Sequence, residues 1–163
     1  GDRRPHKNLK YLIELVKEIR FTLKKDIKLL IAGSKSYKNE SLSKVIERNK
    51  DFVFEKISPT DSELKFLYMN CKSLFLLSKS EGFGIPVIEA ESLGIKVVIS
   101  NIPSLKEVAS KNCLAIDCNS IEKNASEVIS FLNSASSPNV KSIINKWSWK
   151  KSSIKLLKEF AVS

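Results

Sequence analysis

Short apolar runs alternate with helical patterns along most of the chain. Apolar residues recur at helical spacing from Leu9 to Ile19, and an apolar run over residues 27–32 stops at Gly33. The alternation predicts further helices over residues 40–48, 61–70, 86–93 and 104–109, and strands over residues 27–32, 52–54, 74–77, 97–100 and 114–116. The residues after the last strand read as helices up to Val162.

Apolar strands separated by helices indicate a sheet that is covered on both faces. Such a sheet is parallel, so the pattern predicts an α/β fold with a Rossmann-like, doubly wound parallel sheet. Ligands of these sheets bind beyond the carboxyl ends of the strands. Asp61 is expected to cap one helix, Pro86 to lie in the first turn of another, and Gly94 to end it in the left-handed conformation.

The 163 residues are expected to form one domain, residues 1–163. The first predicted element is a helix, although such folds normally begin with a strand, so we expect the chain to be the second half of a larger protein. No apolar run approaches the ~20 residues of a membrane-spanning helix. The opening residues also lack the apolar core of a signal peptide.

The chain carries 28 Lys and Arg against 18 Asp and Glu, a formal charge of +10. This excess favours nucleic acid, anionic lipid or phosphorylated ligands, although the lysines are spread out as on a solvated surface. No stretch interleaves arginine with aromatics, so nucleic acid is not expected as a partner. Cys71, Cys113 and Cys118 form no Cys-x-x-Cys pair, which fits a reduced, cytoplasmic setting, and Cys71 and Cys113 are expected to be small buried thiols.

The loop of residues 78–85 joins a predicted strand to the helix that Pro86 opens, so Gly82-Phe83-Gly84 falls at a helix N-terminus. Glycines there allow close backbone approach, and the free N–H groups favour phosphate. Glu81 and Glu89 flank this point. A carboxylate accepts two hydroxyl hydrogen bonds at once, which suits a ribose diol for Glu89, and Glu81 is placed to meet the hydroxyls of whatever group the phosphate carries. The alternative from spacing alone is a solvated loop residue and a helix-dipole charge.

The run from Ser80 to Ala90 resembles the Glu-x7-Glu signature of retaining glycosyltransferases of the two-Rossmann-domain (GT-B) type, in particular the group 1 (family 4) enzymes with their mannosyltransferases. Further segments also resemble this family: Gly1 to Asn8 its donor-domain opening, Ile57 to Tyr68, Ser100 to Val108, and Trp147-Ser148-Trp149. The resemblance implies the C-terminal, nucleotide-sugar-binding half of a GT-B fold, with the N-terminal acceptor domain absent from this chain.

The resemblance also implies roles for individual residues. Glu89 would bind the ribose hydroxyls, Glu81 the donor sugar, and Lys7 the diphosphate as a cation that stabilises the leaving group. The amides of Phe83 and Gly84 would meet the sugar or diphosphate. Gly82 and Ile85 complete the expected donor loop, and the backbone near Ile57 would meet the base.

The chain departs from the family pattern at three places. Asp2 stands where many relatives carry a phosphate-binding arginine, so Arg3 or Arg4 is expected to take that role. The pair Glu91-Ser92 follows the motif where relatives often carry Met-Ala or a similar pair, and Ser110 replaces a common glycine. His6, the only histidine, is expected to be a partly exposed turn residue, although it lies next to the phosphate-binding segment.

The resemblance thus implies retaining transfer of a hexose from a GDP- or UDP-linked sugar to a hydroxyl, in surface polysaccharide or glycoconjugate synthesis. No metal or other cofactor is expected, and the sequence contains no Asp-x-Asp motif. The fragment is expected to be inactive without its acceptor domain. Two alternatives stay open: a non-catalytic nucleotide-sugar-binding subunit, and a basic module for anionic surfaces. A basic face would also suit the first function at the inner face of a membrane.

Overall fold

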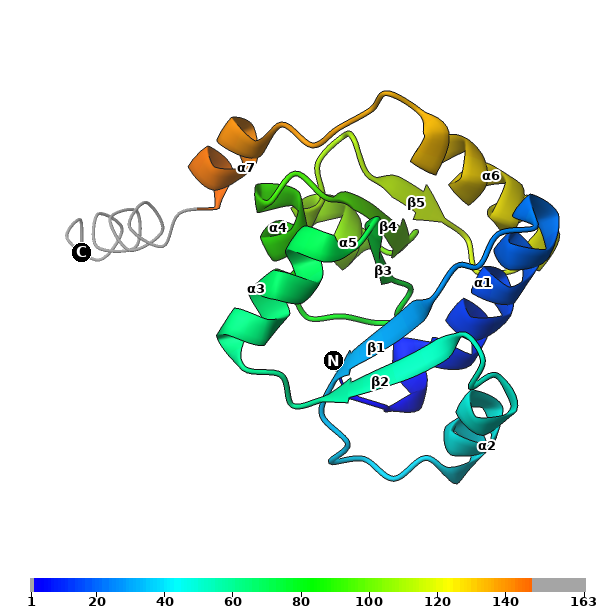
Figure 1. The fold of residues 1–163 in the computed structure, drawn as a ribbon. Helices are drawn as coiled ribbons and strands as arrows, with labels where there is room; N and C mark the ends of the chain where they lie inside the picture. Colours follow the sequence, from blue (N-terminus) through cyan, green and yellow to red (C-terminus); the bar gives the residue numbers. More distant parts are fainter. Residues whose placement is uncertain (1, 148–163) are drawn as a thin grey trace.

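A computed structural model describes residues 2–147 as helices alternating with parallel strands (Figure 1). A 3-10 turn, η1 (Pro5–Lys7), leads into α1 (Leu9–Leu23). The strands are β1 (Leu29–Gly33), β2 (Val53–Ile57), β3 (Ser73–Leu76), β4 (Lys96–Ser100) and β5 (Leu114–Ile116). The other helices are α2 (Glu40–Arg48), α3 (Asp61–Asn70), α4 (Ile85–Ser92), α5 (Pro103–Val108), α6 (Ile121–Asn133) and α7 (Val140–Lys146). The predicted α/β class is confirmed, and the helices expected beyond residue 147 lie outside the described residues.

The strands pair in two parallel groups rather than in one continuous ladder. β1 pairs with β2, and β4 lies between β3 and β5. Side chains nevertheless join the groups, because Leu29 and Ile31 of β1 pack into the same apolar cluster as Phe75 and Leu77 from the β3 region. The groups therefore share a core through packing where their backbones are not paired.

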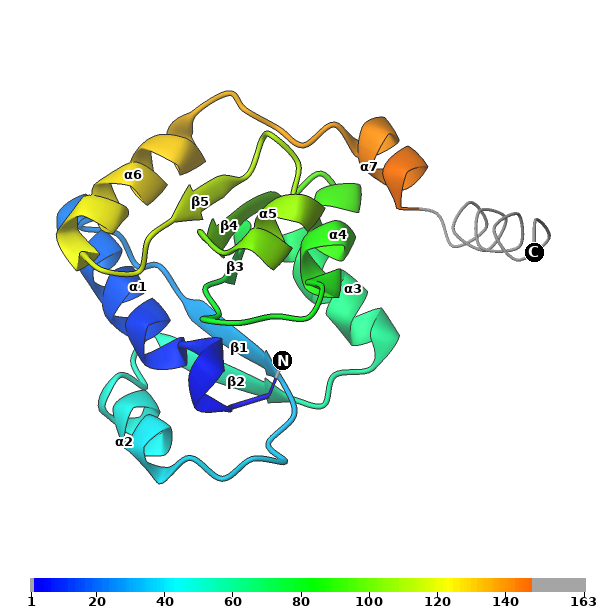
Figure 2. The ribbon, with the colours of Figure 1, turned by 180° about the vertical axis from the view of Figure 1, so that it is seen from behind.

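Helices cover both faces of the three-stranded group, as the doubly wound pattern predicts. Val98 of β4 faces a cluster built with α1 and α6, which lie side by side in both views (Figures 1 and 2). Its neighbours Val97 and Ile99 face the opposite cluster, built with α3, α4 and α5. All three side chains are fully buried, which is why this strand reads as a continuous apolar run.

The helix ends follow local sequence signals, with one correction. α3 is capped by Thr60 rather than by Asp61, because Thr60 accepts from the Glu63 amide while the Glu63 side chain accepts from the Thr60 amide. This reciprocal capping box satisfies two amide groups at once. Gly94 follows the C-cap of α4 with a φ of 78°, so its predicted left-handed conformation is confirmed.

The three cysteines are free, and their predicted burial is wrong for Cys71. Cys71 is exposed because it is the C-cap of α3, where the chain leaves the helix, and its thiol donates to the Tyr68 carbonyl at 3.2 Å. Cys113 is half-buried, and burial followed by the nearby Glu91 carboxylate raises the pKa of its thiol to about 11. Cys113 is therefore protonated at neutral pH.

Candidate functional site

The loop between β3 and α4 presents a helix N-terminus at the carboxyl edge of the strands. Gly84 is the N-cap of α4 with a φ of 97°, and Pro86 lies in the first turn. A Cβ on Gly84 would come within 2.7 Å of the Leu105 Cδ2 atom on α5. Backbone conformation and close packing therefore both require glycine here, and the first turn of α4 has the polarity that favours an anion.

Lys7 and Glu81 meet at this loop. The Lys7 ammonium lies 2.8 Å from Glu81 Oε1, and the hydroxyl of Ser78 donates to the same oxygen at 2.6 Å. The amide of Lys79 donates to the His6 carbonyl at 2.7 Å, which fastens η1 to the loop. Segments more than 70 residues apart thus hold a cation and a carboxylate together.

Glu81 is ionised despite its partial burial. Burial raises the pKa of this carboxyl, but the hydrogen bonds from Lys7 and Ser78 and the charge of Lys7 outweigh it, so the pKa lies below its ordinary value. Ser78 is itself fully buried, and its carbonyl accepts from the Ser100 hydroxyl. The Ser78 hydroxyl therefore orients Glu81 through its hydrogen bond. The sequence pattern did not indicate this role, although Ser78 precedes Glu81 by only three residues.

Glu89 lies in the second turn of α4 and is partly buried. The Tyr68 hydroxyl donates to Glu89 Oε2 at 2.9 Å. Burial, and then the Glu89 carboxylate, raise the pKa of Tyr68 well above its ordinary range, so the hydroxyl stays a donor. Within residues 2–147, Glu89 Oε2 thus accepts one hydrogen bond, from Tyr68, which leaves further lone pairs for a ligand.

The two candidate arginines differ in environment. Arg3 is only 4% exposed, and its guanidinium donates to Glu55 at 2.7 and 2.9 Å and to the Ser34 carbonyl at 2.6 Å. Arg4 is exposed and pairs with its neighbour Asp2. Arg3 therefore forms an internal ion pair, whereas Arg4 has an exposed head group beside η1 that pairs with Asp2.

The remaining predicted residues lie around the same edge. Gly82 has open space where a Cβ would point, and Ile85 is exposed at the start of α4. Phe83 is half-exposed and meets the Trp147 ring edge-to-face at 5.2 Å, which ties the loop to the end of α7. Ile57 ends β2 and is exposed at the carboxyl edge. Trp147 is the first residue of the segment expected to resemble the family's closing segment, and Ser148 and Trp149 lie outside the described residues.

Two of the departures from the family pattern, Glu91 and Ser110, contact each other. Glu91 is 1% exposed, and its carboxylate accepts from the Ser110 amide at 3.0 and 3.2 Å and from the Ser110 hydroxyl at 2.5 Å. A buried carboxylate needs such donors. The pair belongs to the packing between α4 and the end of α5 rather than to the ligand edge.

Within residues 2–147, no group of three His, Cys, Asp or Glu side chains is arranged to hold a metal ion. In the same part of the chain, no helix combines the length and the apolar character needed to cross a bilayer.

Residues 1–146 match the family of group 1 glycosyl transferases. The chain belongs to this family. The match spans the opening segment with Lys7, the Glu81 to Glu89 loop and α7, so the resemblance noted in the sequence is confirmed.

Similar proteins include mannosyltransferases. O-antigen chain mannosyltransferase B of Escherichia coli is 27% identical over 134 residues, which cover 81% of this chain and 35% of that protein. GDP-mannose:cellobiosyl-diphosphopolyprenol alpha-mannosyltransferase of Xanthomonas oryzae is 38% identical over 108 residues, covering 63% of this chain and 28% of that enzyme. The chain thus spans about a third of the length of these relatives.

Solved glycosyltransferases of the GT-B type share the fold. The crystal structure of Anabaena Alr3699/HepE in complex with UDP and glucose superposes with a TM-score of 0.84 at 14% identity, covering all of this chain and 47% of that protein. At this identity the likeness shows the fold, and the predicted Rossmann-like GT-B class is confirmed.

Proposed function

We propose that this chain is the donor domain of a retaining hexosyltransferase and that it binds a nucleotide diphosphate sugar at the carboxyl edge of β3. The observation that carries the proposal is the meeting of Lys7 and Glu81 beside the N-terminus of α4. A cation, an oriented carboxylate and a helix N-terminus are the groups that a sugar diphosphate requires.

The diphosphate has a positive environment in this arrangement. Lys7 offers its ammonium, and Arg4 is the arginine whose exposed head group is available, since Glu55 holds Arg3. The free amides at the start of α4, where Gly84 is the N-cap, would add further donors to the diphosphate. During transfer, these groups would stabilise the charge that develops on the leaving diphosphate.

The two carboxylates would hydrogen-bond to the two sugars of the donor, the ribose and the hexose. Glu89, oriented by Tyr68, would accept from the ribose hydroxyls, and Glu81, oriented by Ser78, would accept from the transferred hexose. When the diphosphate draws Lys7 toward itself, Glu81 gains lone pairs for the hexose. The backbone around Ile57 would meet the base.

GDP-mannose is the first candidate donor, because one similar enzyme is named for it. That enzyme is an alpha-mannosyltransferase, and GDP-mannose carries an α-linked sugar, so an α-product corresponds to retention. UDP-sugars are the second candidate, because the similar Alr3699/HepE structure holds UDP and glucose. The acceptor hydroxyl would belong to a surface polysaccharide or glycoconjugate, and we expect donor binding without transfer by this chain alone.

Calorimetric titration of the chain with GDP, UDP and their sugar conjugates tests the proposal. We expect selective heat of binding that Glu89→Ala removes. Glu107→Ala, at an exposed position of α5, is the matched control and should bind as the parent does. Equal binding by both variants, or binding that depends only on salt, would contradict the proposal and favour a basic surface module.

A further inference from the structure

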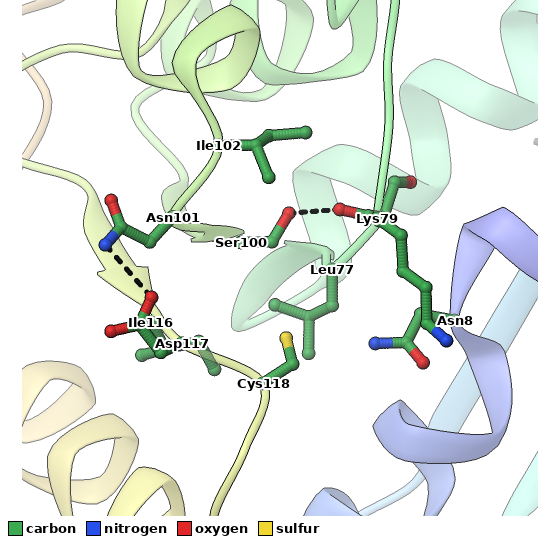
Figure 3. Close-up of a pocket in the computed structure, with 10 residues that line it drawn as sticks. Asn8, Leu77, Lys79, Ser100, Asn101, Ile102, Ile116, Asp117 and Cys118 are labelled. Carbon is green, nitrogen blue, oxygen red and sulfur yellow. Dashed lines mark hydrogen bonds between the residues drawn. The ribbon is translucent and has the colours of Figure 1, made fainter.

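A second pocket opens beside the proposed donor site, at the carboxyl ends of β3, β4 and β5. Its volume is about 130 Å³, and its walls come from the start of α1 and from the three loops that follow these strands (Figure 3). The thiol of Cys118 points into it, and Asn101 hydrogen-bonds to Asp117 at its rim (Figure 3). None of these three residues belongs to the donor site described above.

The rim of the pocket is polar but electrically balanced. Lys79 and Asp117 contribute one charge of each sign, and Asn8 and Asn101 contribute amides that both donate and accept. The chain as a whole carries a charge of +10, so this balance is a local property. A rim of two amides, one ammonium and one carboxylate has no net charge and favours a neutral ligand rich in hydroxyl groups over a phosphate.

The floor of the pocket is apolar. Leu77 and Ile116 are buried there, and Ile102 forms part of the wall. A sugar ring has this combination of surfaces, with C–H groups on its face and hydroxyl groups around its edge. The volume is below the 300–1,000 Å³ of pockets for drug-sized ligands, so the space suits one ring rather than an oligosaccharide buried along its length.

The pocket also adjoins the groups that would hold the donor. Ser78 lines it and donates to Glu81, and Asn8 follows Lys7 directly in the chain. A ring in this pocket would therefore lie beside the hexose that Glu81 binds. Transfer requires the acceptor hydroxyl and the donor hexose to be neighbours in this way.

We propose that this pocket binds the terminal pyranose ring of the acceptor. The inference rests on the proposed donor function and extends it, because it assigns to the donor domain a contact with the acceptor. The Asn101 amide would accept from and donate to ring hydroxyls and the Asp117 carboxylate would accept from them, while Leu77 and Ile102 would face the C–H groups of the ring.

Protection of Cys118 from alkylation tests this directly. The chain is treated with iodoacetamide at alkaline pH, since burial raises the pKa of the Cys118 thiol, and modification of each cysteine is followed by peptide mass spectrometry. With methyl α-mannopyranoside at ten times its dissociation constant, we expect alkylation of Cys118 to slow about ten-fold, as mass action requires. Cys71, exposed on α3, is the internal control and should react at an unchanged rate.

Two variants test whether the protection of Cys118 depends on the residues at the rim of the pocket. Asn101→Ala should raise the dissociation constant of the glycoside about five-fold, as the loss of one hydrogen bond predicts, so that at the same glycoside concentration the slowing of alkylation falls from about ten-fold to about three-fold. Asn119→Ala, exposed in the same loop as Cys118 but outside the pocket, should leave it unchanged. Both variants should retain nucleotide binding in the calorimeter.

Two results would overturn the inference. One is an unchanged rate for Cys118 at the highest soluble glycoside concentration. The other is protection by an intact nucleotide sugar but not by the glycoside, because the pocket would then hold the donor's own hexose. If the chain shows no heat of nucleotide binding but the glycoside still protects Cys118, only the donor function is contradicted. Failure of the acceptor pocket can therefore be distinguished from failure of the donor function.

Discussion

Replacing Gly84 by alanine should destabilise the domain more than replacing any other glycine near α4. Gly84 has a φ of 97°, in the region that residues with a Cβ avoid, and the added methyl group would approach Leu105 Cδ2 at 2.7 Å. Leu105 is fully buried on α5, so it has little room to move. Two separate penalties therefore act at this position.

The magnitudes can be added. A left-handed backbone costs a non-glycine residue about 1–2 kcal/mol, and inserting a methyl group into a close-packed site costs about 1–3 kcal/mol. Alanine also lowers the conformational entropy of the unfolded chain, which offsets about 0.4–1 kcal/mol of this destabilisation. The sum is a loss of about 2–4 kcal/mol, and with an m-value of about 2 kcal/mol/M in urea the unfolding midpoint falls by about 1–2 M.

Substitutions at two other glycines distinguish the cost of the left-handed backbone from the cost of the steric clash. Gly94 has a φ of 78°, but its nearest contact would be Val140 Cγ2 at 3.8 Å, so Gly94→Ala has strain without a clash. It should cost about 1 kcal/mol. Gly82 has neither a positive φ nor a neighbour within 4 Å, so Gly82→Ala should leave stability nearly unchanged and weaken only ligand binding. Urea unfolding followed by circular dichroism measures all three, and a Gly84→Ala midpoint equal to that of Gly82→Ala would refute the reasoning.

Two ion pairs give further predictions. Lys7→Met should raise the pKa of Glu81 and lower the free energy of unfolding by about 1.5–3 kcal/mol at neutral pH. Because the folded-state pKa of Glu81 is lowered, the difference in stability between the variant and the parent should disappear as the pH falls through that pKa. An equal difference in stability at pH 7 and in acid would contradict this prediction. Within residues 2–147, Glu55→Ala removes the carboxylate that pairs with the buried Arg3 guanidinium and leaves its hydrogen bond to the Ser34 carbonyl. The free energy of unfolding in urea should fall by about 3–5 kcal/mol. The exposed carboxylate of Asp26, which pairs with Arg20, is its control, and Asp26→Ala should lower the unfolding midpoint far less than Glu55→Ala does.

Hydrophobic periodicity was enough to place the elements, because the buried strands and amphipathic helices carry distinct patterns. β2 was predicted too short, since Glu55 and Lys56 are polar. These side chains are stabilised by Arg3 and Glu63, partners that hydrophobic periodicity does not indicate. The capping residue of α3 was missed although its Thr-x-x-Glu signal was present.

The site was predictable as far as local motifs reach. The loop and its two carboxylates are contiguous, so spacing and family resemblance pointed to them. The contacts that orient these groups join distant segments: Lys7 reaches Glu81 across 74 positions, and Arg3 reaches Glu55 across 52. Periodicity and spacing contain no information on such pairings, which is why Arg3 looked as available for phosphate as Arg4.

The bond between Glu91 and Ser110 has a consequence for the evolution of this branch of the family. The two positions are 19 residues apart and each departs from the usual pattern, yet they form one buried polar unit. A carboxylate arriving first at position 91 would have been buried without the serine hydroxyl, and a serine arriving first would have been a tolerated, nearly neutral step. We therefore expect the serine to have preceded the glutamate, and descendants that lose the serine to lose the glutamate as well.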